Sequence, residues 1–284
     1  MTLNELRKEC AHVLEEAGIT DAAVDSVLLL EHVLSTDRNH ILAHGNEQAD
    51  DDTVRQYRQL VSRRKEHVPL QHLTGHQEFM GLDFIVDENV LIPRQDTECL
   101  VEEAMREIHD GMKVLDLCTG SGCVIISLAG YKNDLYAVGT DISPEAIRIA
   151  ERNAVLNKRD VRWALGDLYE GLHNIAEYET KFDVIVSNPP YIRSGVIPEL
   201  MEEVKDHEPP AALDGGPDGL DFYRRIIDGA DEHLIRGGCI LFEIGFDQAE
   251  DVSGLLKDRG YRDVETVKDY SGNDRVVKAR RPIL

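Results

Sequence analysis

The sequence predicts an α/β protein with a mostly parallel seven-stranded sheet and an antiparallel edge hairpin, preceded by a small N-terminal helical domain. Short apolar runs typical of buried strands alternate with helical segments through most of the chain, which indicates a parallel sheet covered on both faces. The last two strand-like runs are separated only by turn residues, which indicates the hairpin. Amphipathic helical spacing up to about residue 66 indicates the separate helical domain.

The length and the charge of the chain exclude several classes of protein. A chain of 284 residues, 42% of them hydrophobic, can bury a sizeable core in about two domains, so intrinsic disorder is not expected. The chain has 54 acidic and 31 basic residues, a net charge of −23. Such a charge repels polyanions, so direct nucleic-acid binding is not expected.

No targeting signal is recognisable in the sequence. The longest nearly apolar run, residues 123–130, is shorter than the roughly 20 residues of a membrane span. The first ten residues lack a basic start followed by an apolar stretch, so we expect a cytoplasmic protein without membrane association. The five cysteines are scattered without a C-x-x-C pair, and we expect them to be reduced. We also expect a monomer.

The N-terminal domain is predicted over residues 1–68. Its first helix begins with a capping box formed by Thr2 and Glu5, and apolar residues then recur at helical spacing until Gly18. The same spacing predicts two more helices, at 21–34 and about 51–64. Three short amphipathic helices bury their apolar stripes against one another, so this part of the chain is expected to have a core of its own.

Extended apolar residues interrupted by glycines predict a linker with a β-hairpin over residues 69–92. The main domain is predicted over 93–284 and starts with a helix from Thr97. Its predicted strands are 113–118, 136–141, 161–165, 182–187, 239–244, 262–268 and 274–280. Its other predicted helices lie near 122–130, 144–157, 221–236 and 247–259.

A glycine-containing turn follows the first strand of the main domain. Residues 119–122 read Thr-Gly-Ser-Gly and lead into a helix, whose N-terminal N–H groups can face an anionic or polar ligand. The structural alternative for these glycines is a tight turn that packs the helix on the strand. The next strand, however, ends in Asp141, where a carboxylate can accept hydrogen bonds from both ribose hydroxyls. Together the two features indicate a ligand that contains adenosine.

Two further motifs follow the third and fourth strands. Asp167 ends the third strand, where its carboxylate could accept from an adenine amine or cap a helix. The fourth strand is followed by Asn188, Pro189, Pro190 and Tyr191. The prolines stiffen the turn and leave carbonyl groups free. The Asn188 side-chain oxygen and the Pro189 carbonyl could accept the two protons of a planar NH₂ group, while the Tyr191 ring covers its plane.

At this point the chain resembles the protein-(glutamine-N5) methyltransferase family, which modifies peptide chain release factors and belongs to the class I S-adenosylmethionine-dependent methyltransferases with a Rossmann-like fold. The resemblance covers nearly the whole chain. It rests on Asp-Leu-Cys-Thr-Gly-Ser-Gly, Asp141 and Asn-Pro-Pro-Tyr, and on four further blocks of sequence. These blocks are PLQHLTGHQEFMGLDF at 69–84, LIPRQDTECLVE at 91–102, EPPAALDGGPDGLDFYRRI at 208–226 and DYSGNDRVVKARR at 269–281.

The resemblance implies transfer of a methyl group from S-adenosylmethionine, leaving S-adenosylhomocysteine, to the glutamine side-chain nitrogen of the Gly-Gly-Gln motif in a release factor. It implies that residues 188–191 receive this glutamine, that the helical domain binds the release factor, and that no catalytic histidine, metal or covalent enzyme intermediate is needed. The implied cofactor-binding residues are Cys118, Thr119, Gly120, Ser121, Gly122, Asp141, Ile142, Asp167, Leu168 and Asn188.

The chain departs from the family pattern at two positions. Cys118 replaces the usual first glycine of the cofactor loop, and Gln95 replaces a proline. Because cysteine is small, Cys118 can fit at this position if its φ is negative.

Several other residues allow both a functional and a structural interpretation. Glu243 either shapes the substrate side of the pocket or is a buried, hydrogen-bonded carboxylate. Arg94, Asp96, Thr97 and Glu98 are expected just before the first helix of the main domain, where Asp96 or Thr97 could cap the helix and the others could close over the cofactor. The long segment 208–222 is expected to be a substrate lid. His67, His72 and His76 lack partners at ligand spacing, so metal binding is not expected.

Three other functions compete with this hypothesis. An adenine-N6 DNA methyltransferase needs a similar NH₂ site, but it should have a basic groove and a target-reading domain. A nicotinamide dehydrogenase would use the glycine turn but would leave residues 188–191 without a role. A non-catalytic adaptor that binds S-adenosylmethionine would not need an intact Asn-Pro-Pro-Tyr sequence.

Overall fold

The computed structural model describes residues 1–175 and 181–283. The chain forms two compact units, each described separately below. The smaller unit consists of residues 1–76 and 201–207, and the larger unit of residues 77–200 and 208–284. The short segment 201–207 therefore belongs to the smaller unit, although it lies between two parts of the larger unit in the sequence.

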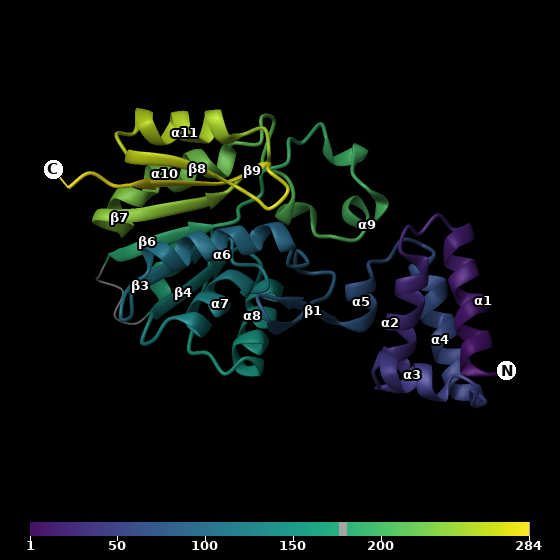
Figure 1. The fold of residues 1–284 in the computed structure, drawn as a ribbon. Coiled ribbons are helices and arrows are strands. Elements are labelled where there is room, and N and C mark those ends of the chain that lie inside the picture. The colour runs from purple at the N-terminus through teal and green to yellow at the C-terminus, as the bar shows by residue number, and fades with distance from the viewer. Residues whose placement is uncertain (176–180, 284) are drawn as a thin grey trace. The chain divides into compact units, whose positions relative to one another are not determined.

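The smaller unit is helical (Figure 1). The Thr2–Glu5 capping box is confirmed, because the Glu5 N–H donates to Thr2 Oγ1 at 3.2 Å and the Thr2 N–H donates to Glu5 Oε2 at 2.8 Å. The helices of its N-terminal part are α1 (Leu3–Glu16), α2 (Ala22–Leu34), α3 (Arg38–His44), α4 (Asp51–Arg64) and α5 (Leu70–Thr74). The largest fully buried side chains of its core are Leu6, Leu14, Leu29, Leu30, Ile41 and Tyr57.

Helices α3 and α5 were not predicted from the sequence. Helix α3 has seven residues and α5 has five, and each buries one side chain, Ile41 and Leu73 respectively. A periodic pattern needs a window of roughly 11 residues or more to be recognised, so helices of this length leave no pattern to read.

A buried arginine connects three segments of the smaller unit. The Arg64 guanidinium donates to Asp25 Oδ2 at 2.7 Å, to the Val68 carbonyl at 3.2 Å and to Glu203 Oε1 at 2.7 Å. Glu203 lies in the short helix α9 (Glu202–Lys205). The Arg64 and Asp25 side chains are only 6% and 7% exposed, whereas that of Glu203 is 36% exposed. Burial raises the pKa of Asp25, which opposes the effect of Arg64.

We expect Arg64→Ala to lower the free energy of unfolding by about 3–5 kcal/mol, because it leaves the Asp25 carboxylate buried without a charged partner. Denaturant unfolding followed by circular dichroism measures this loss. The double variant Asp25→Leu, Arg64→Met should recover most of the stability, because apolar side chains of similar volume can replace a buried ion pair. A loss below about 1 kcal/mol in Arg64→Ala would contradict the assignment of a buried pair.

The larger unit is built on the predicted sheet, with strand order β5-β4-β3-β6-β7-β9-β8. The pairs from β5 to β7 are parallel, and β9 pairs antiparallel with both β7 and β8, so the prediction of a parallel sheet with an antiparallel edge hairpin is confirmed. The strands are β3 (Lys113–Leu117), β4 (Tyr136–Asp141), β5 (Arg162–Leu165), β6 (Phe182–Ser187), β7 (Leu234–Glu243), β8 (Arg262–Lys268) and β9 (Asp274–Arg280).

Helices cover both faces of this sheet (Figure 1). One face packs against α6 (Gln95–Glu107), α7 (Cys123–Tyr131) and α8 (Pro144–Leu156), and the other against α10 (Asp221–His233) and α11 (Ala249–Asp258). The hairpin of β1 (His76–Phe79) and β2 (Leu82–Ile85) precedes α6. The remaining short elements are the 3₁₀ helices η1 (Glu170–Asn174), η2 (Ile197–Glu199) and η3 (Pro210–Ala212).

The predicted boundary between α10 and β7 was wrong. The sequence predicted a helix to residue 236 and a strand from 239, whereas α10 ends at His233 and β7 begins at Leu234. Leu234 pairs with Phe182 of β6 and is fully buried. Leu234 would fit a buried helix as well as a buried strand, so only the pairing with β6 decides its conformation.

The strand order determines where a ligand can bind. Along the chain, β4 and then β5 are added on one side of β3, and β6 is then added on the other side of β3. Ligands of open α/β sheets bind outside the carboxyl ends of the strands at such a reversal. The segments that follow β3 and β6, including residues 118–122 and 188–191, therefore meet at the expected site.

Among the described residues, no helix is long and apolar enough to cross a membrane.

Candidate active site

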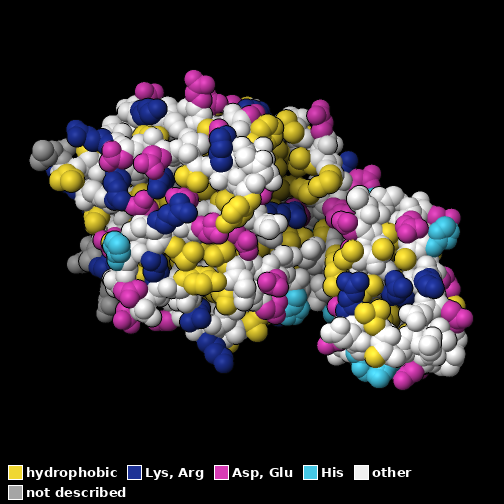
Figure 2. Space-filling model, in the orientation of Figure 1, with side chains coloured by type: hydrophobic (Ala, Val, Ile, Leu, Met, Phe, Trp, Pro, Cys, Tyr) yellow, Lys and Arg dark blue, Asp and Glu magenta, His cyan; other side chains and the backbone are white. Residues whose placement is uncertain are grey.

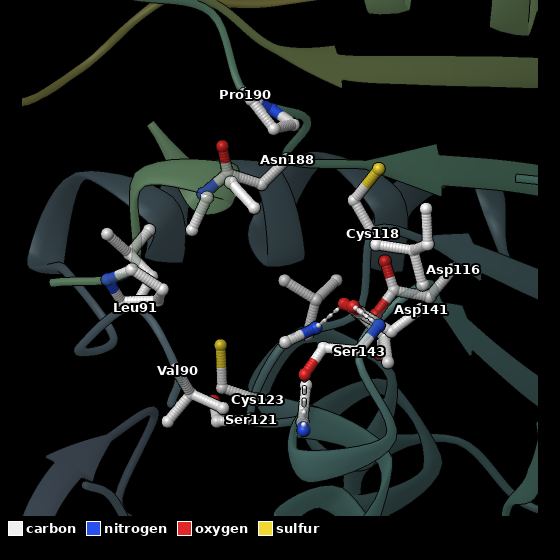
Figure 3. Close-up of a pocket in the computed structure, with 18 of the residues that line it drawn as sticks. Val90, Leu91, Asp116, Cys118, Ser121, Cys123, Asp141, Ser143, Asn188 and Pro190 are labelled. Carbon is white, nitrogen blue, oxygen red and sulfur yellow. Dashed lines mark hydrogen bonds between the residues drawn. The ribbon is translucent and has the colours of Figure 1, made fainter. Parts of the chain in front are cut away.

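A cavity of about 400 Å³ lies at the carboxyl ends of β3, β4 and β6, entirely within the larger unit. Asn188 and Pro190 lie on one side of it and Ser121 and Cys123 on the opposite side (Figure 3). Ten of the residues proposed from the sequence line the cavity. They are Cys118, Thr119, Gly120, Ser121, Asp141, Ile142, Asp167, Leu168, Asn188 and Pro190.

The turn after β3 is held in place by two carboxylates. The Gly120 N–H donates to Asp141 Oδ2 at 2.8 Å, and the Thr119 hydroxyl donates to Asp116 Oδ2 at 2.6 Å. The other Asp141 oxygen, Oδ1, accepts the Ser143 N–H at 3.0 Å. Each Asp141 oxygen therefore accepts a backbone N–H group, and the Ile142 N–H also stabilises the carboxylate. A carboxylate has about four acceptor positions, so Asp141 can still accept from a ligand.

Burial perturbs both of these carboxyl groups. It raises the pKa of Asp116 to about 7, with a further rise from Asp141, although the Thr119 hydroxyl and the Ile125 N–H lower it. Burial also raises the pKa of Asp141, against the effect of backbone N–H groups. Such shifts arise because a low-dielectric site disfavours the charged form. The cavity therefore favours a ligand whose positive charge can keep these carboxylates ionised.

Cys118 does not meet the condition of a negative φ under which a cysteine fits easily. Its φ is +60°, in the left-handed region that glycine adopts most easily, and Gly120 and Gly122 in the same turn have φ values of +55° and +79°. The path of the turn from β3 into α7 imposes this conformation. Cys118 therefore has a backbone conformation that a glycine would adopt without strain, at a cost of about 1–2 kcal/mol.

We expect Cys118→Gly to change the free energy of unfolding by less than about 1 kcal/mol, because the relief of backbone strain offsets the lost packing and the greater freedom of glycine in the unfolded chain. Cys118→Val should instead lose about 2 kcal/mol or more, because a β-branched residue is strongly disfavoured at this φ. Denaturant unfolding of the two variants measures the difference. Equal losses in both variants would show that packing, and not backbone conformation, dominates at this position.

Three of the proposed residues do not line the cavity: Gly122, Pro189 and Tyr191. Gly122 precedes α7, and a Cβ there would come within 2.9 Å of atoms of Ile126 and Trp163, so its small size serves packing. Pro189 is buried. The Tyr191 hydroxyl points to Glu243 Oε1, at 3.3 Å.

Asn188 is fixed by the first helix of the larger unit. Its Nδ2 group donates to Thr97 Oγ1 at 3.3 Å, and both residues line the cavity. Neither Asp96 nor Thr97 caps α6, because the N-cap position is Arg94 and no side chain accepts there. The Arg94 side chain donates to both carboxylate oxygens of Glu208, at 2.8 Å each.

The segment 208–222 is attached to the residues that follow Asn188. The Ile192 N–H donates to the Leu213 carbonyl at 3.0 Å, and the Gly215 N–H donates to the Ile192 carbonyl at 2.8 Å. Glu208 is buried and also accepts the Ile92 N–H. The role of this segment as a substrate lid stays a prediction.

Asp167 lines the cavity, but its carboxylate accepts from Arg225 at 2.6 Å. The helix-cap interpretation does not hold, because Tyr169 is the N-cap residue of η1 and no side chain caps that helix.

Other cavity residues were missed in the sequence. Asp116 lies within the apolar strand β3 and lines the cavity. Its position in the Asp-Leu-Cys-Thr-Gly block was the available signal that it belongs to the site. Leu91 and Pro93 lie in the block 91–102 and Phe222 in the block 208–226, so the family resemblance of these blocks was the available signal for them. The missed residues include Val90, Leu91, Pro93, Ser143, Ala146 and Phe222.

Comparisons with known proteins agree with this architecture. Residues 5–75 match the PrmC N-terminal domain, and residues 95–205 match the methyltransferase small domain. The crystal structure of a methyltransferase from Pyrococcus furiosus has the same fold, with a TM-score of 0.52 and 22% identity over 72% of this chain and 90% of that chain. The fold and the cavity define a class I methyltransferase, an enzyme dependent on S-adenosylmethionine.

Similar proteins identify the family. A release factor glutamine methyltransferase from Clostridium acetobutylicum is 45% identical over 273 residues, which is 95% of each chain. A protein of the same description from Geobacter sulfurreducens is 43% identical over 94% of this chain and 92% of its own length. The chain belongs to the release factor glutamine methyltransferase family.

Proposed function

We propose that this protein transfers the methyl group of S-adenosylmethionine to the side-chain nitrogen N5 of the glutamine in the Gly-Gly-Gln motif of peptide chain release factors. One observation carries the proposal: Asn188, with a side-chain amide suited to binding another amide, lines the same cavity as the buried Asp116 and the partly buried Asp141. The glutamine site and the cofactor site would then be continuous.

The cavity fits the cofactor in charge and in hydrogen-bonding groups. S-adenosylmethionine supplies an electrophilic methyl group on a positively charged sulfur. The Asp141 carboxylate would accept from the ribose hydroxyls, and Asp116 would attract the positively charged part of the molecule. Gly120 and Ser121 allow close approach of the backbone, because a side chain at Gly120 would be strained at its φ of +55°.

The acceptor nitrogen must be oriented and activated by groups of the protein. An amide nitrogen is a poor nucleophile, because its lone pair is delocalised into the carbonyl group. The Asn188 oxygen and the Pro189 carbonyl would orient the NH₂ group and stabilise the positive charge that develops on it as the N–C bond forms and the S–C bond of the donor breaks. The methylated nitrogen would then lose one proton to water, which leaves a neutral N5-methyl amide and S-adenosylhomocysteine. Fixing two reactants in line is worth up to roughly 7–11 kcal/mol in well-oriented systems. This scheme uses no catalytic histidine, metal or covalent enzyme intermediate.

The remaining parts of the proposal concern the partners. We infer that the helical domain, residues 1–68, binds the body of the release factor, and that residues 69–92 link it to the catalytic domain, residues 93–284. The protein would act as a monomer in the cytoplasm, where release factors work. A direct nucleic-acid substrate is disfavoured by the charge of −23. On the face of the larger unit seen in Figure 2, Lys and Arg are interspersed with Asp and Glu.

Incubation with S-adenosylmethionine and a purified release factor, followed by mass spectrometry, tests this function. We expect one added methyl group on the glutamine of the Gly-Gly-Gln motif and none on a release factor variant with alanine at that position. Methylation of adenine in duplex DNA in a parallel reaction would instead support a DNA methyltransferase. Tight cofactor binding without transfer to any release factor would support an adaptor.

A further inference from the structure

Gln248 is a buried glutamine that contacts three segments around the cavity without lining the cavity itself. It is 1% exposed and directly precedes α11. Its Nε2 group donates to the Tyr191 carbonyl at 2.9 Å and to the Gly219 carbonyl at 3.2 Å. Its Oε1 atom accepts the Gly245 N–H at 2.9 Å. The side chain therefore joins the segment after β6, the segment before α10 and the loop after β7.

The orientation of the Gln248 amide follows from its partners. A backbone carbonyl can only accept a hydrogen bond, and a backbone N–H can only donate one. The NH₂ end of the amide must therefore face the carbonyl groups of Tyr191 and Gly219, and its oxygen must face the Gly245 N–H. Both amide protons of Gln248 are used in this way, so a methionine or an ionised glutamate of similar size cannot replace it.

The groups that Gln248 joins are packed closely against one another. Gly219 is buried with a φ of +76°, and a Cβ atom there would clash with the Tyr191 carbonyl oxygen and with Gln248 Nε2. No side chain can therefore separate these two segments at this point. Because both carbonyl groups accept from the same NH₂ group, Gln248 holds the two segments together.

The segment 188–191 is held at both of its ends. The Asn188 side chain donates to α6 at one end, and the Tyr191 carbonyl accepts from Gln248 at the other. The two prolines between them have a fixed φ, so the remaining freedom of the segment lies mainly in its ψ angles. The direction of the Pro189 carbonyl, one of the two proposed acceptors, depends on these ψ angles. Hydrogen bonds at both ends of the segment restrict them.

We propose that Gln248 is a positioning residue of the acceptor site: by holding the Tyr191 and Gly219 carbonyl groups, it fixes the backbone of residues 188–191 in the position that binds the acceptor amide. Because Gln248 does not line the cavity, it acts on the substrate only through this backbone. The proposal rests on the function proposed above, since this backbone matters for methyl transfer only if residues 188–191 receive the glutamine.

Asn153 offers a matched comparison on the opposite side of the cavity. It is a fully buried carboxamide in α8 with the same pattern of hydrogen bonds. Its Nδ2 group donates to the carbonyls of Ile85 and Ser121 at 3.0 and 2.9 Å, and its Oδ1 atom accepts the Ile85 N–H at 2.7 Å. Ser121 belongs to the turn after β3 and lies across the cavity from Asn188 (Figure 3). Asn153 thus holds the cofactor side as Gln248 holds the acceptor side.

Steady-state kinetics with a release factor as acceptor, together with calorimetry of S-adenosylmethionine binding, test the proposal. Gln248→Met keeps the length of the side chain but removes its hydrogen bonds, and it should lower kcat about 10-fold, because small displacements of a reacting group cost much of the benefit of orientation. Gln248→Glu should lower kcat about 100-fold, because an ionised carboxylate would face two carbonyl oxygens. In both variants the Kd for S-adenosylmethionine should change only a few-fold.

Asn153→Asp is the same chemical change as Gln248→Glu, and it should give the opposite pattern. A carboxylate at this position would face the Ile85 and Ser121 carbonyls and so displace the turn after β3. The Kd for S-adenosylmethionine should rise about 10-fold, the effect expected from weakened hydrogen bonds to the cofactor. At saturating cofactor, kcat should stay within a few-fold of the wild type. A loss of stability alone would not produce this crossed pattern.

The outcomes distinguish this proposal from the proposed function. If the wild type methylates the release factor but the two Gln248 variants keep its kcat and its KM, the positioning role is overturned and the proposed function stands. The role is also overturned if Gln248→Glu and Asn153→Asp change kcat and Kd in the same way. If the wild type transfers no methyl group to the release factor, both proposals are overturned. If Gln248→Glu fails to fold, as judged by circular dichroism, the comparison of Gln248→Met with Asn153→Asp decides the matter.

Discussion

Replacing Asn188 with alanine is expected to lower kcat for release factor methylation about 10²–10³-fold, the usual loss when one oriented hydrogen-bonding group is removed from a reacting centre. The side chain would serve the acceptor amide, and its Nδ2 group is held by Thr97 at 3.3 Å. The Kd for S-adenosylmethionine should therefore change only a few-fold. Single-turnover kinetics and calorimetry measure the two quantities independently.

Asn157→Ala is a matched control for this variant. Asn157 also donates through its Nδ2 group, to the Asp83 carbonyl at 2.8 Å, but it does not line the cavity. Its kcat should stay close to that of the wild type. A large loss of cofactor affinity in Asn188→Ala, with kcat preserved at saturating cofactor, would show that Asn188 serves the nucleoside and not the acceptor.

Asp141→Ala is expected to show the opposite pattern, with the Kd for S-adenosylmethionine raised about 100-fold. The Asp141 carboxylate accepts the Gly120 and Ser143 N–H groups and has lone pairs left for a ligand. Hydrogen bonds to a charged group contribute about 1.5–3 kcal/mol each, and a factor of ten in affinity corresponds to about 1.4 kcal/mol. At saturating cofactor, kcat should fall much less than in Asn188→Ala.

Asp141→Asn tests the contribution of the charge. An asparagine can still accept one hydrogen bond, so its Kd should lie between those of the wild type and Asp141→Ala. Calorimetry at fixed pH gives both values. An unchanged Kd in Asp141→Ala would remove this residue from the cofactor site, and equal effects of Asn and Ala would assign the whole effect to the charge.

The strands and the longer helices could be predicted because burial leaves a pattern in the sequence. The five strands from β3 to β7 contain apolar runs, since a parallel sheet is covered on both faces. Helices α1, α4 and α8 have apolar residues at a regular spacing. The short helices α3 and α5 have too few turns for such a pattern, and the end of α10 was decided by pairing of Leu234 with β6.

The site could be predicted in part, because its residues follow strand ends that parallel pairing brings to one edge. This is why Gly120, Asp141 and Asn188 line one cavity. The sequence did not predict the positive φ of Cys118, which the turn into α7 imposes, or the ion pair of Asp167 with Arg225. The ion pair depends on a residue that is distant in the chain, and the φ of Cys118 depends on the path of the backbone.

The local sequence thus determined the longer elements, the parallel direction of the strands and the family. The spacing of buried residues and the short motifs each involve residues that are close together in the chain. The tertiary structure alone decided which groups meet behind the cavity. The Tyr191 hydroxyl donates to Glu243, and Asn188 Nδ2 donates to Thr97; these bonds form only when β7, α6 and the segment after β6 are packed together. The hydrogen bonds in such a cluster depend on the positions of the groups in space, and the spacing of the residues along the chain does not predict them.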